Sequence, residues 1–155
     1  MYKTILVPHA GTPAGDIALK HAIHIAKLSS SKIILLHIIE EFPKVPLVLH
    51  ASLATKIEQQ IAEVMEELKD KMEKEMIKRL ELCKKHGIDA QLKVTVGLPS
   101  EEILKIVKNQ KIDLIVMAKR RKLKGIKSLL TLGSVSRKIV ENTSRPVLMI
   151  DIEKK

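Results

Sequence analysis

The stretch Ile33-Ile34-Leu35-Leu36-His37-Ile38-Ile39 decides the fold class of this chain. It is apolar at every position but one, and the apolar residues run on without alternating with polar ones. A continuous run of this length predicts a strand that is buried on both faces, as in parallel sheets covered by helices. Shorter apolar segments predict further strands over residues 5–7, 113–118 and 146–150, the second of which begins with Asp113. Residues 91–96 alternate instead, which predicts a strand at the edge of the sheet.

Helical patterns separate these runs along the whole chain. Thr12 and Pro13 are typical of a helix start, and apolar residues recur at helical spacing up to the serines at 29–31. A long helix is expected over residues 52–85 and is closed by Gly87, since glycine is favoured just beyond a helix end. Two shorter helices are expected, one capped by Ser100 and one starting near Ser134.

The order of elements predicts an α/β fold with a single doubly wound, five-stranded parallel sheet of order 3-2-1-4-5 and helices on both faces. With 155 residues, 45% of them hydrophobic, the chain is expected to form one domain over residues 1–155. A single cysteine, Cys83, excludes an internal disulfide framework and a cysteine-rich zinc module. We expect no metal site, no membrane span and no signal peptide, and therefore a cytoplasmic protein.

In such a sheet, ligands bind beyond the carboxyl ends of the strands where the strand order reverses. The reversal lies between the first and fourth strands, so the loop 8–12 and the segment 118–134 should face each other. Gly133 and Ser134 come directly before a helix, where free N–H groups favour an anion. A phosphate site at this place is therefore physically reasonable, although Gly-Ser before a helix is also a common structural cap.

Several motifs resemble those of universal stress proteins, and the resemblance follows that family's order over the whole chain. The matching segments are Tyr2-Lys3-Thr4-Ile5-Leu6-Val7-Pro8, Leu35-Leu36-His37-Ile38-Ile39, Gly97-Leu98-Pro99-Ser100-Glu101-Glu102-Ile103, Asp113-Leu114-Ile115-Val116-Met117, Leu132-Gly133-Ser134-Val135-Ser136 and Pro146-Val147-Leu148-Met149-Ile150. The resemblance implies an adenine nucleotide alpha hydrolase-like fold, frequent homodimers and a role in stress physiology. One branch of the family binds ATP and another does not.

The resemblance also implies a set of candidate nucleotide-binding residues, with ATP or another adenine nucleotide as the ligand. They are Pro8, His9, Ala10, Ile38, Met117, Ala118, Arg121, Gly133, Ser134 and Val135. The ATP-binding branch carries an acidic residue after the first strand and Gly-x-x-Gly, nine residues and Gly-Ser after the fourth. In this chain, Ala10 stands at the position of the acidic residue, and Ala118 and Arg121 stand at the positions of the two glycines. Eleven residues separate Arg121 from Gly133.

A basic segment follows the fourth strand. Residues 119–127 hold six positive charges and no acid, out of a net charge of +10 for the chain. Three interpretations stay open: a solvated surface loop, an anion site that uses Lys119, Arg120, Arg121 or Lys122, and contact with a polyanion such as nucleic acid. Tyr2 and Phe42 are the only aromatic residues, which argues against nucleic acid, because single-strand binders stack bases on aromatic side chains.

For most of the histidines and sulfur-containing residues, the sequence favours a structural role. His37 lies in the buried strand and is expected to be a hydrogen-bonded core residue, whereas His9 lies in the loop where the strand order reverses. His21 and His24 form no metal-binding pattern. Cys83 is expected to be a small apolar residue, and the methionines at 65, 72 and 76 to face the core or a partner.

We find no catalytic residues, because the sequence shows neither a Ser-His-Asp signature nor a Walker motif. The expected function is a non-catalytic regulatory protein in which adenine-nucleotide binding is weak, altered or absent. The alternative is a slow ATP-hydrolysing switch, and a third reading is a polyanion binder. The fifth strand is predicted at a sheet edge, so its residues Val147, Leu148, Met149 and Ile150 are expected to form a homodimer interface.

Overall fold

The computed structural model describes residues 1–41, 51–119 and 133–151. Within these ranges the elements are β1 (Thr4–Pro8), α1 (Pro13–Ser29), β2 (Lys32–Ile39), α2 (Ala51–Lys85), β3 (Ala90–Val96), α3 (Pro99–Asn109), β4 (Leu114–Ala118), α5 (Ser134–Asn142) and β5 (Val147–Ile150). The strands form one parallel sheet of order β3-β2-β1-β4-β5. The predicted fold class and strand order are confirmed.

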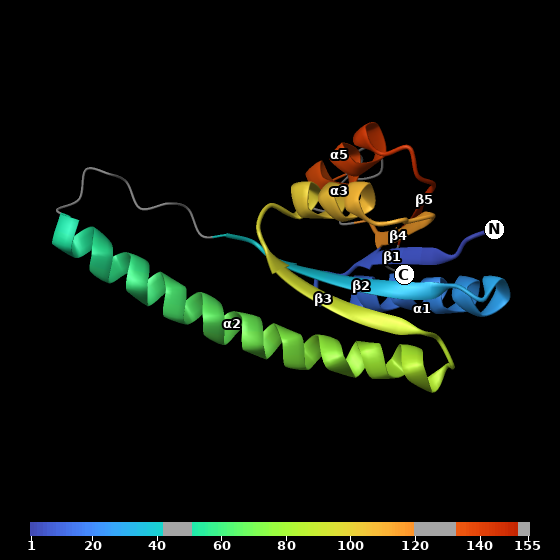
Figure 1. Cartoon of the computed structure of the whole chain (residues 1–155), viewed down its shortest axis with the longest axis horizontal. Helices are drawn as coiled ribbons and strands as arrows, with labels where there is room; N and C mark the ends of the chain where they lie inside the picture. The colour runs from blue at the N-terminus through green and yellow to red at the C-terminus, as the bar shows by residue number, and fades with distance from the viewer. Residues whose placement is uncertain (42–50, 120–132, 152–155) are drawn as a thin grey trace.

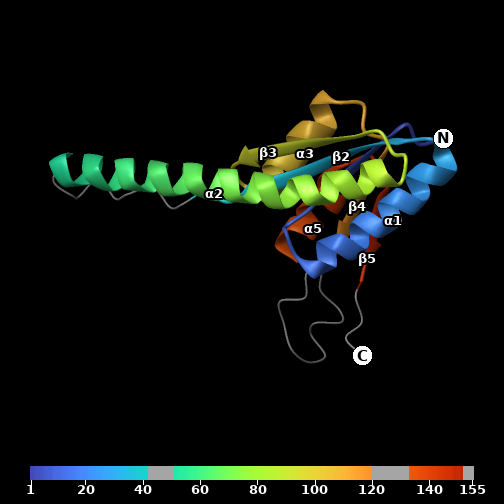
Figure 2. The same cartoon turned by 90° about the horizontal axis from the view of Figure 1, so that it is seen from below.

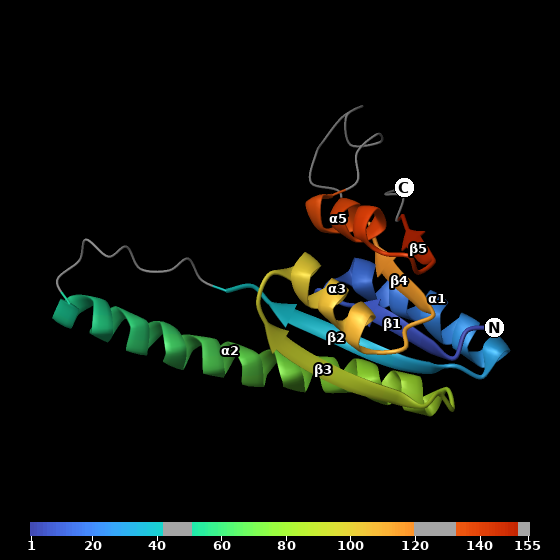
Figure 3. The same ribbon diagram turned by 45° about the horizontal axis from the view of Figure 1, so that its top comes forward.

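Helices cover both faces of the sheet (Figure 1). On one face, α1 and the second half of α2 pack through residues such as Leu19, Met76 and Cys83, which are fully buried. On the other face, α3 and α5 lie side by side and contribute Ile103 and Ile139 (Figure 3). The three central strands β1, β2 and β4 are buried on both sides, which is why the sequence of β2 has no polar alternation.

The long helix α2 extends well beyond the sheet (Figures 1 and 2). Its second half carries Met76 and Cys83 into the core, whereas Leu53 and Val64 in its first half are about half exposed, at 47% and 51%. Gly87 ends the helix as expected, because its φ of 74° is in the left-handed region and its N–H donates to the Lys84 carbonyl. No helix in the described ranges has both the length and the apolar character needed to cross a membrane.

Two predicted helix starts have different outcomes. Thr12 caps α1 as expected, since its Oγ1 accepts the Gly15 N–H at 3.3 Å with Pro13 at the first helical position. The predicted cap at Ser100 is wrong, because α3 begins at Pro99 and its cap residue is Leu98, which makes no side-chain cap bond. Proline has its φ already fixed at a helical value and has no N–H to satisfy, so it begins the helix one residue before Ser100.

Candidate functional site

The carboxyl ends of β1 and β4 lie next to each other, because the two strands pair in parallel with Ile5 opposite Leu114 and Leu6 opposite Ile115. The loop after β1 and the segment after β4 therefore start side by side, at the reversal in strand order. Gly133 is the cap residue of α5, and Arg137 donates its N–H to the Gly133 carbonyl. This is the place at which the sequence predicts a ligand.

The candidate nucleotide-binding residues in the described ranges differ in how far they reach the surface. Ala10 and Ser134 are exposed, His9 and Met117 are buried, and the others are half-buried, namely Pro8, Ile38, Ala118, Gly133 and Val135. Ile38, Met117 and Val135 belong to the apolar cluster on the α3 and α5 side of the sheet. Arg121 lies outside the described residues.

Among the anion-binding candidates, Lys119 is described, whereas Arg120 and Lys122 lie outside the described residues. The Lys119 Nζ forms an ion pair with Asp151 Oδ2 at 3.3 Å, and its side chain is only 14% exposed. The Lys119 N–H also donates to the Ile150 carbonyl at 2.8 Å. Lys119 thus ties the start of the basic segment to the end of β5.

His9 is turned into the protein and makes hydrogen bonds at both ring nitrogens. Its Nδ1 accepts the Gly11 N–H at 3.0 Å, so Nε2 carries the proton and donates to Asp16 Oδ1 at 3.1 Å. The ring passes against α1 at Gly15, where a Cβ would lie 2.8–2.9 Å from three ring atoms. A glycine in the first turn of α1 therefore makes room for the imidazole.

Two electrostatic shifts accompany this arrangement. Burial and the positive charge of Arg79 lower the pKa of His9 to about 4, although the neighbouring Asp16 acts in the opposite direction. Partial burial raises the pKa of Asp16, but its hydrogen bond and charge interaction with Arg79 outweigh burial and hold that pKa below its usual value. At neutral pH, His9 is neutral and Asp16 is a carboxylate.

The backbone of the same loop is held by β2. The His9 N–H donates to the Leu36 carbonyl at 2.8 Å, and the His37 Nδ1 is 2.7 Å from the His9 carbonyl, to which it donates. His37 is only 6% exposed, so the prediction of a hydrogen-bonded core histidine is confirmed. The loop after β1 has a defined shape fixed by its own side chain and by its neighbours.

Sequence analysis missed Gly15, Asp16 and Arg79, which complete this environment. Arg79 lies 63 residues from Asp16, and no local pattern connects them. One signal was present: Arg79 follows Met76 by three residues, on the side of α2 that faces the sheet. A charged residue at such a position indicates a partner carboxylate, because an unpaired charge is costly to bury.

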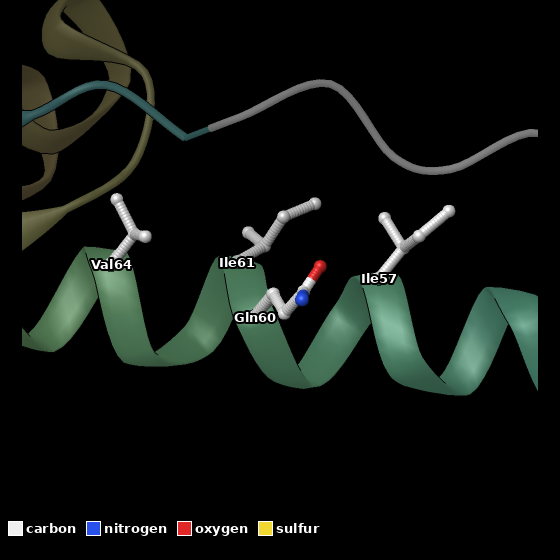
Figure 4. A pocket seen from close by; sticks show the side chains of 4 residues that line it. All are labelled: Ile57, Gln60, Ile61 and Val64. Atoms are coloured by element: carbon white, nitrogen blue, oxygen red, sulfur yellow. The ribbon is translucent and has the colours of Figure 1, made fainter.

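Two hollows lie elsewhere on the described surface. One, of about 190 Å³, is lined by Ile57, Gln60, Ile61 and Val64 on the first half of α2, where the three aliphatic side chains point to the same side of the helix (Figure 4). The other, of about 430 Å³, lies between β3 and α3 and includes Lys93 and Glu102. Neither hollow contains a candidate nucleotide-binding residue, and the strand-order reversal remains the better site because of its topology.

The fold and the position of these loops define a doubly wound α/β protein with a candidate ligand site at the switch point of its sheet. The sequence profile of the universal stress protein family matches residues 1–151, and this chain belongs to that family.

Individual relatives agree. A universal stress protein of Methanocaldococcus jannaschii is 33% identical over 156 residues, which cover 97% of this chain and 95% of the relative. One of Bacillus subtilis is 30% identical over 154 residues, 97% of this chain and 99% of the relative. The solved structure of the M. jannaschii protein superposes on this chain with a TM-score of 0.81 at 27% identity. The superposition covers 100% of this chain and 99% of the solved chain. A universal stress protein solved in complex with cAMP superposes with a TM-score of 0.69 at 20% identity, over 97% of both chains.

Proposed function

We propose that this universal stress protein is a non-catalytic regulatory homodimer of the cytoplasm that binds an adenine nucleotide weakly at the loops after β1 and β4. Two related folds support an adenine nucleotide as the ligand class, since one was solved with cAMP and another, from Archaeoglobus fulgidus, with dAMP. The observation that carries the weak affinity is that the loop after β1 presents an exposed alanine, Ala10, and no carboxylate, while the His9 ring is turned inward.

That loop offers a ligand no carboxylate. Ala10, at the acidic position of the ATP-binding branch, presents a methyl group at the surface. Asp16, the acidic residue nearest to it in sequence, is already bonded to His9 and Arg79. A ribose hydroxyl placed at Ala10 therefore lacks an acceptor there, and one good contact of this kind is worth about 1–3 kcal/mol, or roughly tenfold to a hundredfold in affinity.

Titration calorimetry with ATP, AMP and cAMP tests this proposal. For ATP we expect a Kd of about 100 μM or weaker, and low-micromolar binding would overturn the proposal. Ala10→Asp should tighten ATP binding by about tenfold to a hundredfold, whereas the control Ala10→Val, which supplies no acceptor, should not. Phosphate release, measured in the same samples, separates this function from the alternative of a slow ATP-hydrolysing switch.

The homodimer is proposed to form through β5. This strand is at the sheet edge, and its side chains alternate between the two core faces, with Leu148 and Ile150 on the α1 side and Val147 and Met149 on the other. Pro146 and Ile150 turn their carbonyls to β4, where they accept the N–H groups of Ile115 and Lys119. Because backbone direction alternates along a strand, Leu148 also faces β4, and the N–H groups of Val147 and Met149 point to the free edge.

This alternation provides a matched pair of proline variants. Met149→Pro removes an N–H that faces the free edge, so it should leave the protomer folded but dissociate the dimer. Leu148→Pro removes an N–H that bonds within the sheet, so it should destabilise the protomer itself. Light scattering gives the mass and circular dichroism reports folding. A folded Met149→Pro variant that remains dimeric, or a monomeric wild type, would overturn the β5 interface.

A further inference from the structure

The loop after β1 is connected to α2 by three side chains in series. His9 donates from Nε2 to Asp16 Oδ1, and Arg79 on α2 holds both carboxylate oxygens of Asp16, with Nε 2.6 Å from Oδ1 and Nη2 3.3 Å from Oδ2. Paired bonds between a guanidinium and a carboxylate are among the strongest and most directional in proteins. Helices α1 and α2 cover the same face of the sheet (Figure 2). Asp16 on α1 and Arg79 on α2 meet there.

Each member of the series is restrained by more than one contact. Arg79 also donates from Nη1 to the Glu75 carbonyl at 3.1 Å, so its guanidinium is fixed to its own helix, and its side chain is only 18% exposed. The Asp16 carboxylate bridges α1 and α2. The His9 ring is fully enclosed, and its other nitrogen holds the Gly11 N–H. A displacement of the Arg79 guanidinium is therefore expected to shift the His9 ring through Asp16.

We infer that Arg79 is a positioning residue for the candidate ligand site: from α2 it fixes Asp16, Asp16 fixes the His9 ring, and the ring fixes the backbone at Gly11. The part of this inference that concerns a ligand rests on the proposed nucleotide binding. Ala10 contributes no polar side chain, so the backbone and the shape of the loop matter for holding a ligand. A loop held in one conformation before binding loses less entropy when the ligand arrives.

The same connection explains why a residue on α2 matters to a site at the ends of β1 and β4. Gly11 has a φ of 75°, which a residue with a side chain rarely adopts, and the bond from its N–H to His9 Nδ1 closes this turn. Without the bond to Asp16, only packing and the Gly11 N–H hold the ring, so the bond from Gly11 to His9 Nδ1 is weakened. The turn then samples other conformations, and the fraction competent to bind falls.

The test compares Arg79→Met with Lys78→Met, a control that removes an exposed cation from the adjacent position of the same helix. The first readout is on the ligand-free protein: amide hydrogen exchange at Gly11 and the ring nitrogen signals of His9 by NMR. Arg79→Met should speed exchange at Gly11 and raise the pKa of His9, because a nearby positive charge is removed. Exchange in the centre of β2 should stay slow, which shows that the fold is intact.

The second readout is the affinity for AMP by calorimetry. Arg79→Met should weaken it by roughly twofold to thirtyfold, Arg79→Lys by less, and Lys78→Met not at all. Asp16→Asn, which keeps the shape of the side chain but not its charge, should reproduce the faster exchange at Gly11. Unchanged exchange and unchanged ring signals in Arg79→Met would overturn the inference. If wild type binds no AMP while Gly11 responds to Arg79→Met, the proposed nucleotide function fails and the connection from α2 to the loop stands.

Discussion

The buried imidazole of His9 should make the stability of the whole fold depend on pH between about 5 and 7. Its pKa is lowered from 6.5 to about 4 in the folded protein, by burial and by the charge of Arg79. In this window the unfolded chain takes up a proton at His9 and the folded chain does not, so stability rises with pH. With about 1.4 kcal/mol for each unit of pKa difference, the fold should lose roughly 2 kcal/mol from His9 between pH 7 and pH 5.

The groups around His9 do not cancel this effect. Arg79 keeps its charge throughout the window, and Asp16 has a pKa held below its ordinary value of 3.8, so it stays ionised. The stability that Asp16 contributes is present above its unfolded pKa and is lost only as pH falls through its folded pKa. His37 contacts the backbone of His9 and contributes a further lowering of the His9 pKa, which acts in the same direction as burial.

Urea unfolding followed by circular dichroism at pH 7, 6 and 5 measures the dependence. His9→Gln should lower stability at every pH but flatten the slope by about 2 kcal/mol over the window, because no group titrates at that position. His24→Gln, which changes an exposed histidine of α1, should keep the wild-type slope. Equal losses in wild type and His9→Gln would show that the folded imidazole titrates normally, and the description of the enclosed ring would be refuted.

Two further substitutions test the packing around the loop and the sheet. Gly15→Ala should destabilise the fold by about 1–3 kcal/mol, because the new Cβ would lie 2.8–2.9 Å from the His9 ring. In a His9→Ala background, the same change should stabilise α1 by about 0.5–1 kcal/mol. Equal effects of Gly15→Ala in both backgrounds, measured by thermal unfolding, would contradict the contact. Asp113→Ala should lower the free energy of unfolding by about 1–2 kcal/mol, because the Asp113 carboxylate accepts the N–H groups of Lys3 and Thr4 at 2.9 and 3.0 Å. An unchanged midpoint in urea unfolding would show that water replaces these bonds.

Much of the fold could be predicted because strand position in an α/β protein leaves a mark on the sequence. The uninterrupted apolar runs of β1, β2 and β4 correspond to strands covered on both faces, and the alternating run of β3 corresponds to the sheet edge. Helix boundaries depend on one or two residues, so they are predicted less accurately than the order of the strands. Ser100 has the side chain of a cap, but Pro99 before it already has the backbone of a first helical residue.

The position of the candidate site was also predictable, since it follows from strand order alone. The orientation of the side chains there was not. Whether His9 turns outward or inward depends on a glycine six residues later and on an arginine 63 residues beyond Asp16. Such long-range contacts follow no periodicity, because they arise from the packing of α1 and α2 on the same face of the sheet.

The inward orientation of His9 also bears on where binding energy for an anionic ligand must come from. In the loop after β1, the His9 ring, the His9 backbone and the Gly11 N–H are all engaged within the protein, and Ala10 adds no polar side chain. That loop can shape the site but contributes little charge to it. For the proposed nucleotide, we expect the phosphate to be held from the other side, where Gly133 caps α5 and Ser134 begins it. We therefore expect different effects from the two sides of the site. Removing positive charge after β4 should lower the affinity for all phosphate ligands to a similar extent. Removing Arg79 should instead change the shape of the loop after β1, and so change the affinity for some ligands more than for others.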